Sequence, residues 1–145
     1  MIRKLTGVVS CLLLLVAADA RAFEIDYDPR RPQELRPCDT HLERGRREEA
    51  SACYVQLLER SSSGIVRAEA AWRLHDVRRA NELFREILGS APQATYERIR
   101  WGHLFLQTHQ HAQAAELFRE AREIAPDDAY AKLGLARVLA ERFEG

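Results

Sequence analysis

Three histidines lie close together in the sequence and could in principle bind a metal ion. They are His103, His109 and His111. Residues two positions apart, such as His109 and His111, point to different sides of a helix, and no carboxylate or cysteine stands at ligand spacing from them. We therefore interpret these histidines, together with His41 and His75, as turn and surface residues. The sequence predicts no metal site.

Serines are the next candidates for chemistry, as nucleophiles. Ser61, Ser62 and Ser63 form a short run without the Gly-x-Ser-x-Gly pattern that exposes a hydrolase serine at a tight turn. No glycine-rich phosphate-binding pattern occurs in the chain, and the acidic pair Asp127 and Asp128 is explained by helix capping. The sequence contains no catalytic constellation and no cofactor motif, and we expect a protein that is not an enzyme.

The charge balance excludes one class of partner. The chain has 145 residues, 46% hydrophobic and 30% charged, with 22 basic and 22 acidic side chains. This is the composition of a globular protein. A nucleic-acid-binding protein needs a surplus of Lys and Arg to release counterions from phosphates, and this chain has none. We expect no nucleic-acid partner.

The N-terminus has the three zones of a secretory signal peptide. Basic residues precede an apolar stretch at residues 7–18, and small residues follow it. The apolar stretch is too short to cross a hydrocarbon core of about 30 Å, so no transmembrane segment is expected after cleavage. Cleavage after Ala22 is preferred over cleavage after Ala20. Lipid attachment at Cys11 is a further alternative, which is less favoured because most of the apolar run follows that cysteine.

Export makes the mature protein periplasmic or secreted and slightly acidic. Cleavage removes three basic residues and one acidic residue, which leaves 19 basic against 21 acidic side chains and a net charge of −2. The arginine-rich, lysine-poor composition favours a periplasmic location over a eukaryotic secretory route. Any partner is therefore expected to be selected by surface shape and apolar contacts more than by the overall electric field.

The mature chain keeps one pair of cysteines, Cys38 and Cys53, in an oxidising compartment. If two antiparallel helices turn at Gly45, the two cysteines lie at one level of the hairpin. A disulfide closing this loop would stabilise the fold by about 3 kcal/mol. Free thiols are the alternative, and a metal site is disfavoured because two cysteines supply too few ligands.

One stretch of the sequence recurs with an offset of 34 residues. Residues 82–86 read ELFRE, and residues 116–120 read the same. Four flanking residues recur at the same offset: Ala80 with Ala114, Ala91 with Ala125, Pro92 with Pro126, and His75 with His109. Apolar residues at helical spacing predict two helices for each unit, and a small residue, Gly102, is expected to face Ala114 so that the helix backbones approach closely.

This pattern resembles a tetratricopeptide repeat, whose signature runs Trp, Leu-Gly, Tyr, Ala, Phe, Pro. The residues that match or conservatively replace the signature are Trp101, Gly102, Phe105, Ala114, Phe118, Ala121 and Pro126 in one unit and Ala80, Phe84 and Pro92 in the unit before it. Arg98 stands where the family has its first Trp. His75 and His109 stand at the turn where the family usually has a left-handed glycine. The resemblance implies an all-α fold, a right-handed superhelix of antiparallel helix pairs.

The repeat divides the chain into segments with distinct roles. The signal peptide is expected at residues 1–22, and an extended, mobile lead-in, interrupted by three prolines, at residues 23–37. The helical segments are expected to be a degenerate capping hairpin at 38–60, repeats at 64–94 and 95–128, and the first helix of a truncated repeat at 129–145. That last helix is expected to pair with a later part of a longer protein or with another chain.

The resemblance implies a concave surface that binds a protein or peptide. The residues expected on that surface are Trp72, Arg73, Tyr96, Ile99, His103, Leu106 and Arg137. The alternative is that Tyr96, Ile99 and Leu106 pack against the next repeat. Some family members bind a terminal carboxylate through Lys and Asn, which is not expected here because Lys132 is the only mature lysine and Asn81 the only asparagine.

Three functional hypotheses follow. The first is an exported interaction module, an adaptor or scaffold for another envelope protein. The second is the region of a longer envelope enzyme that positions its substrate or partner. The third is a structural protein that self-associates through the open C-terminal helix.

Overall fold

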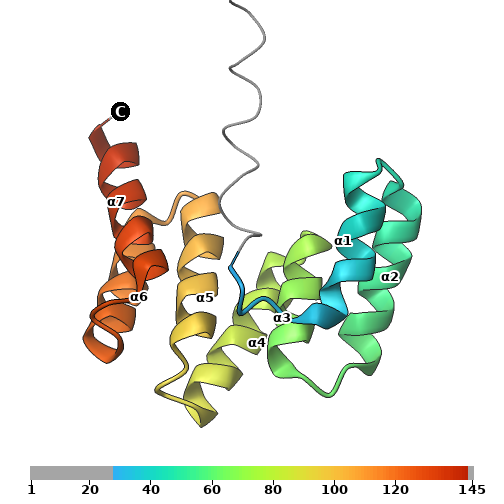
Figure 1. Cartoon of the computed structure of the whole chain (residues 1–145), viewed down its shortest axis with the longest axis horizontal. Helices are drawn as coiled ribbons and strands as arrows, with labels where there is room; N and C mark the ends of the chain where they lie inside the picture. The colour runs from blue at the N-terminus through green and yellow to red at the C-terminus, as the bar shows by residue number, and fades with distance from the viewer. Residues whose placement is uncertain (1–27, 144–145) are drawn as a thin grey trace, which may run out of the picture.

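The computed structural model describes residues 28–143, and these form one 3-10 helix and seven α-helices without a strand. The elements are η1 (Gln33–Leu35), α1 (Arg36–Glu43), α2 (Arg47–Arg60), α3 (Gly64–Arg73), α4 (Val77–Ser90), α5 (Thr95–Gln107), α6 (His111–Ile124) and α7 (Ala129–Phe143). Each α-helix packs against its neighbours in sequence, and Figure 1 shows the helices following one another in an arc from α1 to α7. The predicted all-α solenoid of antiparallel helix pairs is confirmed.

Each of the turns α1–α2, α3–α4 and α5–α6 has one residue with positive φ. These residues are Gly45 (φ 73°), His75 (φ 61°) and His109 (φ 58°). In each turn a backbone N–H beyond the helix reaches back to a carbonyl five residues earlier, as Asp76 N does to Ala71 O at 3.0 Å. This bond satisfies a carbonyl at the helix end, and it requires a left-handed residue in the turn. The predicted turn positions are confirmed.

Helices α5, α6 and α7 interlock around the ring of Phe118. A Cβ atom added to Gly102 would lie 2.9 Å from this ring, and one added to Gly134 would lie 2.3 Å from it. We predicted that Gly102 makes room for Ala114. The atoms nearest to Gly102 belong instead to Phe118, because the buried aromatic ring from α6 fills the space between α5 and α7.

The lead-in differs from the prediction. We expected an extended, mobile segment to residue 37, but residues 28–31 form a β-turn in which Arg31 N donates to Asp28 O (2.9 Å), and α1 begins at Arg36. Pro37 falls in the first helical turn, where a missing N–H has no helical acceptor and proline is tolerated. Asp28, Arg31 and Leu35 are buried, so this segment packs against the helices.

No helix of residues 28–143 is long and apolar enough to span a membrane. The predicted signal peptide and the alternative lipid attachment at Cys11 lie outside the described residues.

Candidate functional site

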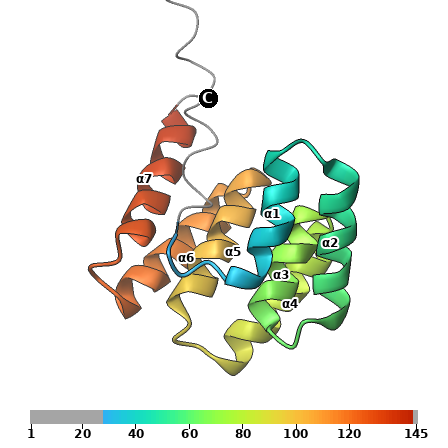
Figure 2. The ribbon, with the colours of Figure 1, turned by 45° about the vertical axis from the view of Figure 1, so that its right-hand side comes forward.

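The first helices of the repeats, α3, α5 and α7, share contacts with the segment that precedes α1. We call the face formed by Glu69 and Trp72 of α3, Tyr96 and Arg100 of α5, and Tyr130 of α7 the first-helix face. Figure 2 shows the segment that precedes α1, in blue, passing beside α5. Its side chains contact α3, α5 and α7, so the face is covered in part by the chain's own lead-in.

A buried carboxylate, Glu69, organises the centre of the face. Arg100 donates to it through Nε and through Nη2 (2.7 Å), and Arg31 Nη1 donates to its Oε2 at 3.0 Å. Burial alone would raise the pKa of Glu69, but the two guanidinium groups lower it below its ordinary value. Trp72 lies under Arg100, whose Cζ is 4.8 Å from the ring centroid. Glu69 is therefore ionised and paired.

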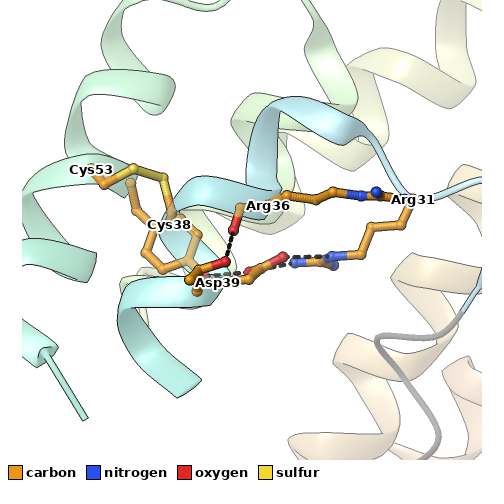
Figure 3. The surroundings of a disulfide bond; sticks show 7 residues. Arg31, Arg36, Cys38, Asp39 and Cys53 are labelled. Carbon is orange, nitrogen blue, oxygen red and sulfur yellow. Dashed lines mark hydrogen bonds and ion pairs between the residues drawn. A yellow bond between two sulfur atoms is a disulfide. The ribbon is translucent and has the colours of Figure 1, made fainter. Parts of the chain in front are cut away.

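Arg31 extends this network to α1. Its Nη2 and Nε donate to the two oxygens of Asp39 at 2.9 and 3.0 Å, and the hydroxyl of Tyr54 donates to Asp39 as well (2.5 Å). Asp39 follows Cys38, which the structure joins to Cys53 by the predicted disulfide, with 5.4 Å between the Cα atoms. Figure 3 shows Asp39 beside the disulfide and facing Arg31. The covalent link between α1 and α2 thus lies next to the carboxylate that holds the lead-in.

Arg30 occupies a second site on the same face. Its Nη1 donates to Asp128 Oδ2 at 2.6 Å, and its Cζ lies 5.4 Å from the ring centroid of Tyr96 and 5.2 Å from that of Tyr130. Asp28 binds the same guanidinium, with 2.6 Å between Nη2 and Oδ2. Two carboxylates and two aromatic rings therefore surround one arginine, an arrangement that suits a planar cation.

Two polar side-chain atoms of α5 are buried without a hydrogen-bond partner in the described part of the chain. They are the hydroxyl oxygen of Tyr96 and Nδ1 of His103. Burial, with Arg100 and Arg137 nearby, lowers the pKa of His103 to about 3, and its ring packs edge-on against Phe118 at a centroid distance of 5.0 Å. His103 is therefore neutral at physiological pH.

The structure separates the predicted partner-binding residues into two groups. Trp72, Tyr96 and His103 lie at or beside the network, and Arg73 interacts electrostatically with Glu69 and Arg137 with His103. Ile99 and Leu106 are buried in the core cluster that contains Phe118, as the alternative interpretation expected. The binding role of all seven residues stays a prediction.

Sequence reasoning missed the charged residues that dominate this face: Arg30, Arg31, Glu69, Arg100 and Asp128. A signal for two of them was present. Glu69 interrupts an otherwise apolar run at residues 68–72, and Arg100 lies four residues after Tyr96 and three before His103, on the same side of α5. Our prediction placed only uncharged residues on that side of α5. A charged residue within an apolar helix face, however, indicates a buried ion pair.

Metal binding has no structural support among residues 28–143, where no group of three or more His, Cys, Asp or Glu side chains could hold an ion. The rings of His109 and His111 contact each other edge-on, with 6.1 Å between the ring centroids. His111 faces Glu141, with 3.1 Å between Nε2 and Oε2.

Comparison with solved structures places the chain among helical repeat domains. The first TPR of Spaghetti (RPAP3), bound to the HSP90 peptide SRMEEVD, has a TM-score of 0.55 and 16% identity and covers 77% of this chain and 91% of its own. The second TPR domain of human RPAP3, in complex with the HSP70 peptide SGPTIEEVD, has a TM-score of 0.52 and 16% identity, with 72% and 91% covered. The Sgt2 TPR domain from Aspergillus fumigatus has a TM-score of 0.56 and 18% identity, with 77% and 78% covered.

Sequence comparison agrees over part of the chain. No curated protein matches, but residues 99–142 match the family described as tetratricopeptide repeat. This match covers most of α5, all of α6 and nearly all of α7. Residues 99–142 thus match the tetratricopeptide-repeat family, and the described chain has the tetratricopeptide-repeat fold.

Proposed function

We propose that this chain is an exported, non-enzymatic protein–protein interaction module, an adaptor or scaffold that binds a non-helical segment of an envelope protein on its first-helix face. One observation carries the proposal. The face already binds a non-helical segment, the β-turn at residues 28–31, through Glu69 of α3, Tyr96 of α5 and Asp128 before α7. A face that holds such a segment within the chain has the chemistry to hold one from another protein.

Structural relatives support the class of partner. The TPR domains of RPAP3 bind HSP90 and HSP70 peptides, both of which end in EEVD. The first-helix face of this chain instead pairs arginines with Glu69 and Asp128. We therefore propose a peptide or protein partner whose charge differs from that of the acidic peptides ending in EEVD.

The chemistry of the face supports binding rather than catalysis. Glu69 and Arg100, its most deeply buried ionisable groups, pair with one another, which leaves neither free to transfer a proton.

Export is supported by the sequence of residues 1–22 and by the disulfide, which persists in oxidising compartments. Fractionation of the expressing cells, followed by N-terminal sequencing, tests this part. We expect the mature protein outside the cytoplasm with Phe23 as its first residue. Protein that keeps Met1 and fractionates with the cytoplasm would contradict export.

Partner binding is tested by capture from envelope extract with three baits. These are the mature chain, its Tyr130→Ala variant on the first-helix face, and an Arg85→Ala variant, which changes an exposed residue of α4. We expect the first and third baits to recover the same protein and the Tyr130→Ala bait to lose it, with all three showing the same helical circular dichroism. Equal recovery by all three baits would refute the assignment of the face.

A further inference from the structure

The lead-in presents two adjacent arginines to two different sites. Residues 28–31 form a β-turn with proline at its second position, and Asp28 Oδ1 accepts from Arg30 N at 2.9 Å. The turn directs Arg31 to Glu69 and Asp39 and directs Arg30 to Asp128 and the two tyrosines. The two arginines therefore can have different roles.

Arg31 has the environment of a structural residue. Its side chain is 7% exposed, and its acceptors Glu69 and Asp39 are largely buried with it. Removing Arg31 would take one ion-pair partner from each of these two carboxylates in the interior. Such a loss strongly lowers the stability of a fold. Arg31 holds the lead-in to the fold.

Arg30 has the environment of an exchangeable ligand. Its side chain is 35% exposed, so it can leave and another group can enter without opening of the core. Its main acceptor outside the turn, Asp128, is positioned independently of it, because Asp128 Oδ1 caps α7 by accepting from the N–H groups of Tyr130 (2.9 Å) and Ala131 (3.1 Å). The site therefore persists when Arg30 is absent.

The aromatic part of the site is likewise held by the fold. Tyr96 is buried in α5, and its hydroxyl oxygen has no hydrogen-bond partner in the described part of the chain. Buried hydroxyl groups normally have a partner, so this oxygen is available to an incoming polar group. Tyr130 completes the site from α7, where its ring centroid lies 5.2 Å from Cζ of Arg30 and its N–H donates to Asp128 Oδ1.

We infer that Tyr96, Tyr130 and Asp128 form an arginine-binding site, which the chain fills with its own Arg30 and which accepts an arginine of the partner when Arg30 withdraws. The inference rests on the proposed function and specifies its partner as an arginine-bearing segment. Because Arg30 is tethered to the site, it competes at an effective concentration on the order of millimolar. Arg30 therefore weakens partner binding, and withdrawal of its side chain restores the full affinity of the site.

Chemical complementation tests the site without knowledge of the partner. The mature chain and its Arg30→Ala variant are titrated with ethylguanidinium chloride, and the ring signals of Tyr130 are followed by NMR. We expect saturable binding to Arg30→Ala and at least tenfold weaker binding to the unchanged chain, where Arg30 occupies the site. Ethylammonium is the matched control and is expected to bind at least several-fold more weakly, because it lacks the planar, multidentate guanidinium.

A second substitution separates the site from a general effect on folding. The Arg30→Ala/Asp128→Asn variant keeps an oxygen that can cap α7 but lacks the carboxylate charge. We expect it to fold and to lose saturable ethylguanidinium binding. Failure of Arg30→Ala to bind ethylguanidinium, or equal binding by the single and double variants, would overturn the inference.

Capture from envelope extract then distinguishes this inference from the proposed function. Arg30→Ala is expected to recover more partner than the unchanged chain, and Asp128→Asn less. If a face-dependent partner is recovered equally with all three baits, the proposed function stands and the arginine site is wrong. If ethylguanidinium binds as expected but no face-dependent partner is recovered, the site stands and the proposed function is wrong.

Discussion

The two ends of the arc are stabilised by different kinds of interaction. Around α1, α2 and α3, the interior contains a disulfide and a chain of ion pairs that runs from Asp39 through Arg31 to Glu69 and on to Arg100. Around α5, α6 and α7, the ring of Phe118 fills the space that Gly102 and Gly134 leave open. The first end adds charge pairing and a covalent bond to its apolar cluster, whereas the second depends on the fit of apolar shapes.

Helix length explains the difference. Helix α1 has 8 residues, whereas α6 has 14 and α7 has 15. A short helix buries little apolar surface, so the first hairpin gains stability from a cross-link and from ion pairs to the lead-in. The longer helices contribute to the apolar cluster around Phe118, which is close-packed. Substitutions at the two ends are therefore expected to destabilise the fold for different reasons.

The largest effect is expected at the ionic end, for Glu69→Ala. The substitution leaves Arg31 and Arg100 buried without their shared carboxylate, and breaking such a pair costs about 3–5 kcal/mol. Urea unfolding followed by circular dichroism measures the loss. Glu82→Ala is the control, because Glu82 makes only partly exposed ion pairs within α4, and it should cost less than about 1 kcal/mol. Equal losses of unfolding free energy in the two variants would show that the buried network contributes no more to stability than the partly exposed ion pairs of α4.

The next effect is expected for the disulfide. Replacing both Cys38 and Cys53 by serine removes the cross-link that closes a loop with a sequence separation of 15, and the free energy of unfolding should fall by about 3 kcal/mol. Reduction of the unchanged protein should produce a loss of similar size. A double variant as stable as the oxidised protein would contradict the idea that the short hairpin needs the bond.

At the apolar end, Gly134→Ala is expected to cost about 1–3 kcal/mol through overpacking. The ring of Phe118 has little room to move away from a new methyl group at Gly134, because the same ring atoms also lie close to Gly102. Gly89→Ala is the control, since nothing lies within 4 Å of its added Cβ, and it should stabilise α4 by up to about 1 kcal/mol. Combining Gly134→Ala with Phe118→Leu should recover part of the lost stability, because the smaller side chain leaves room for the new methyl group. If the effects of the two substitutions on the unfolding free energy simply add, the contact between Gly134 and Phe118 is excluded as the cause.

The last expected effect depends on pH and concerns His103, whose ring packs against Phe118. Its pKa is about 3 in the folded chain and about 6.5 when unfolded, so the unfolded state binds more protons between these values. Stability should therefore be constant above about pH 6.5 and should fall below it, by up to about 1.4 kcal/mol per pH unit from this group. Thermal unfolding at pH 7, 6 and 5 measures the slope. His103→Gln should reduce the dependence of stability on pH. The control substitution His75→Asn, at an exposed residue, should leave this dependence unchanged.

The repeat residues were predictable because they follow local rules. The offset of 34 residues, the small residues at helical spacing and the turn positions of His75 and His109 depend on helical periodicity and on backbone geometry at single residues. The disulfide also followed from local geometry, since a short hairpin turning at Gly45 leaves Cys38 and Cys53 at one level.

The contacts of the lead-in were not predictable in this way. Arg31 pairs with Glu69 across 38 positions, and Arg30 pairs with Asp128 across 98. Nothing in the spacing of these residues indicates their pairing, because the lead-in has no periodicity and its prolines are compatible with many paths. The burial of Ile99 and Leu106 was likewise undetermined, since a wide apolar stripe does not say which part faces the next helix.

The sequence by itself therefore determined the helices, their turns and the covalent link of the first hairpin, since helical periodicity, left-handed turns and short-loop geometry act over a few residues. Only the tertiary structure decided that residues 28–31 fold back onto α3, α5 and α7 and that a buried carboxylate holds two arginines. The physical reason is that charges are buried only where partners from distant elements meet, and that meeting is a property of the assembled fold.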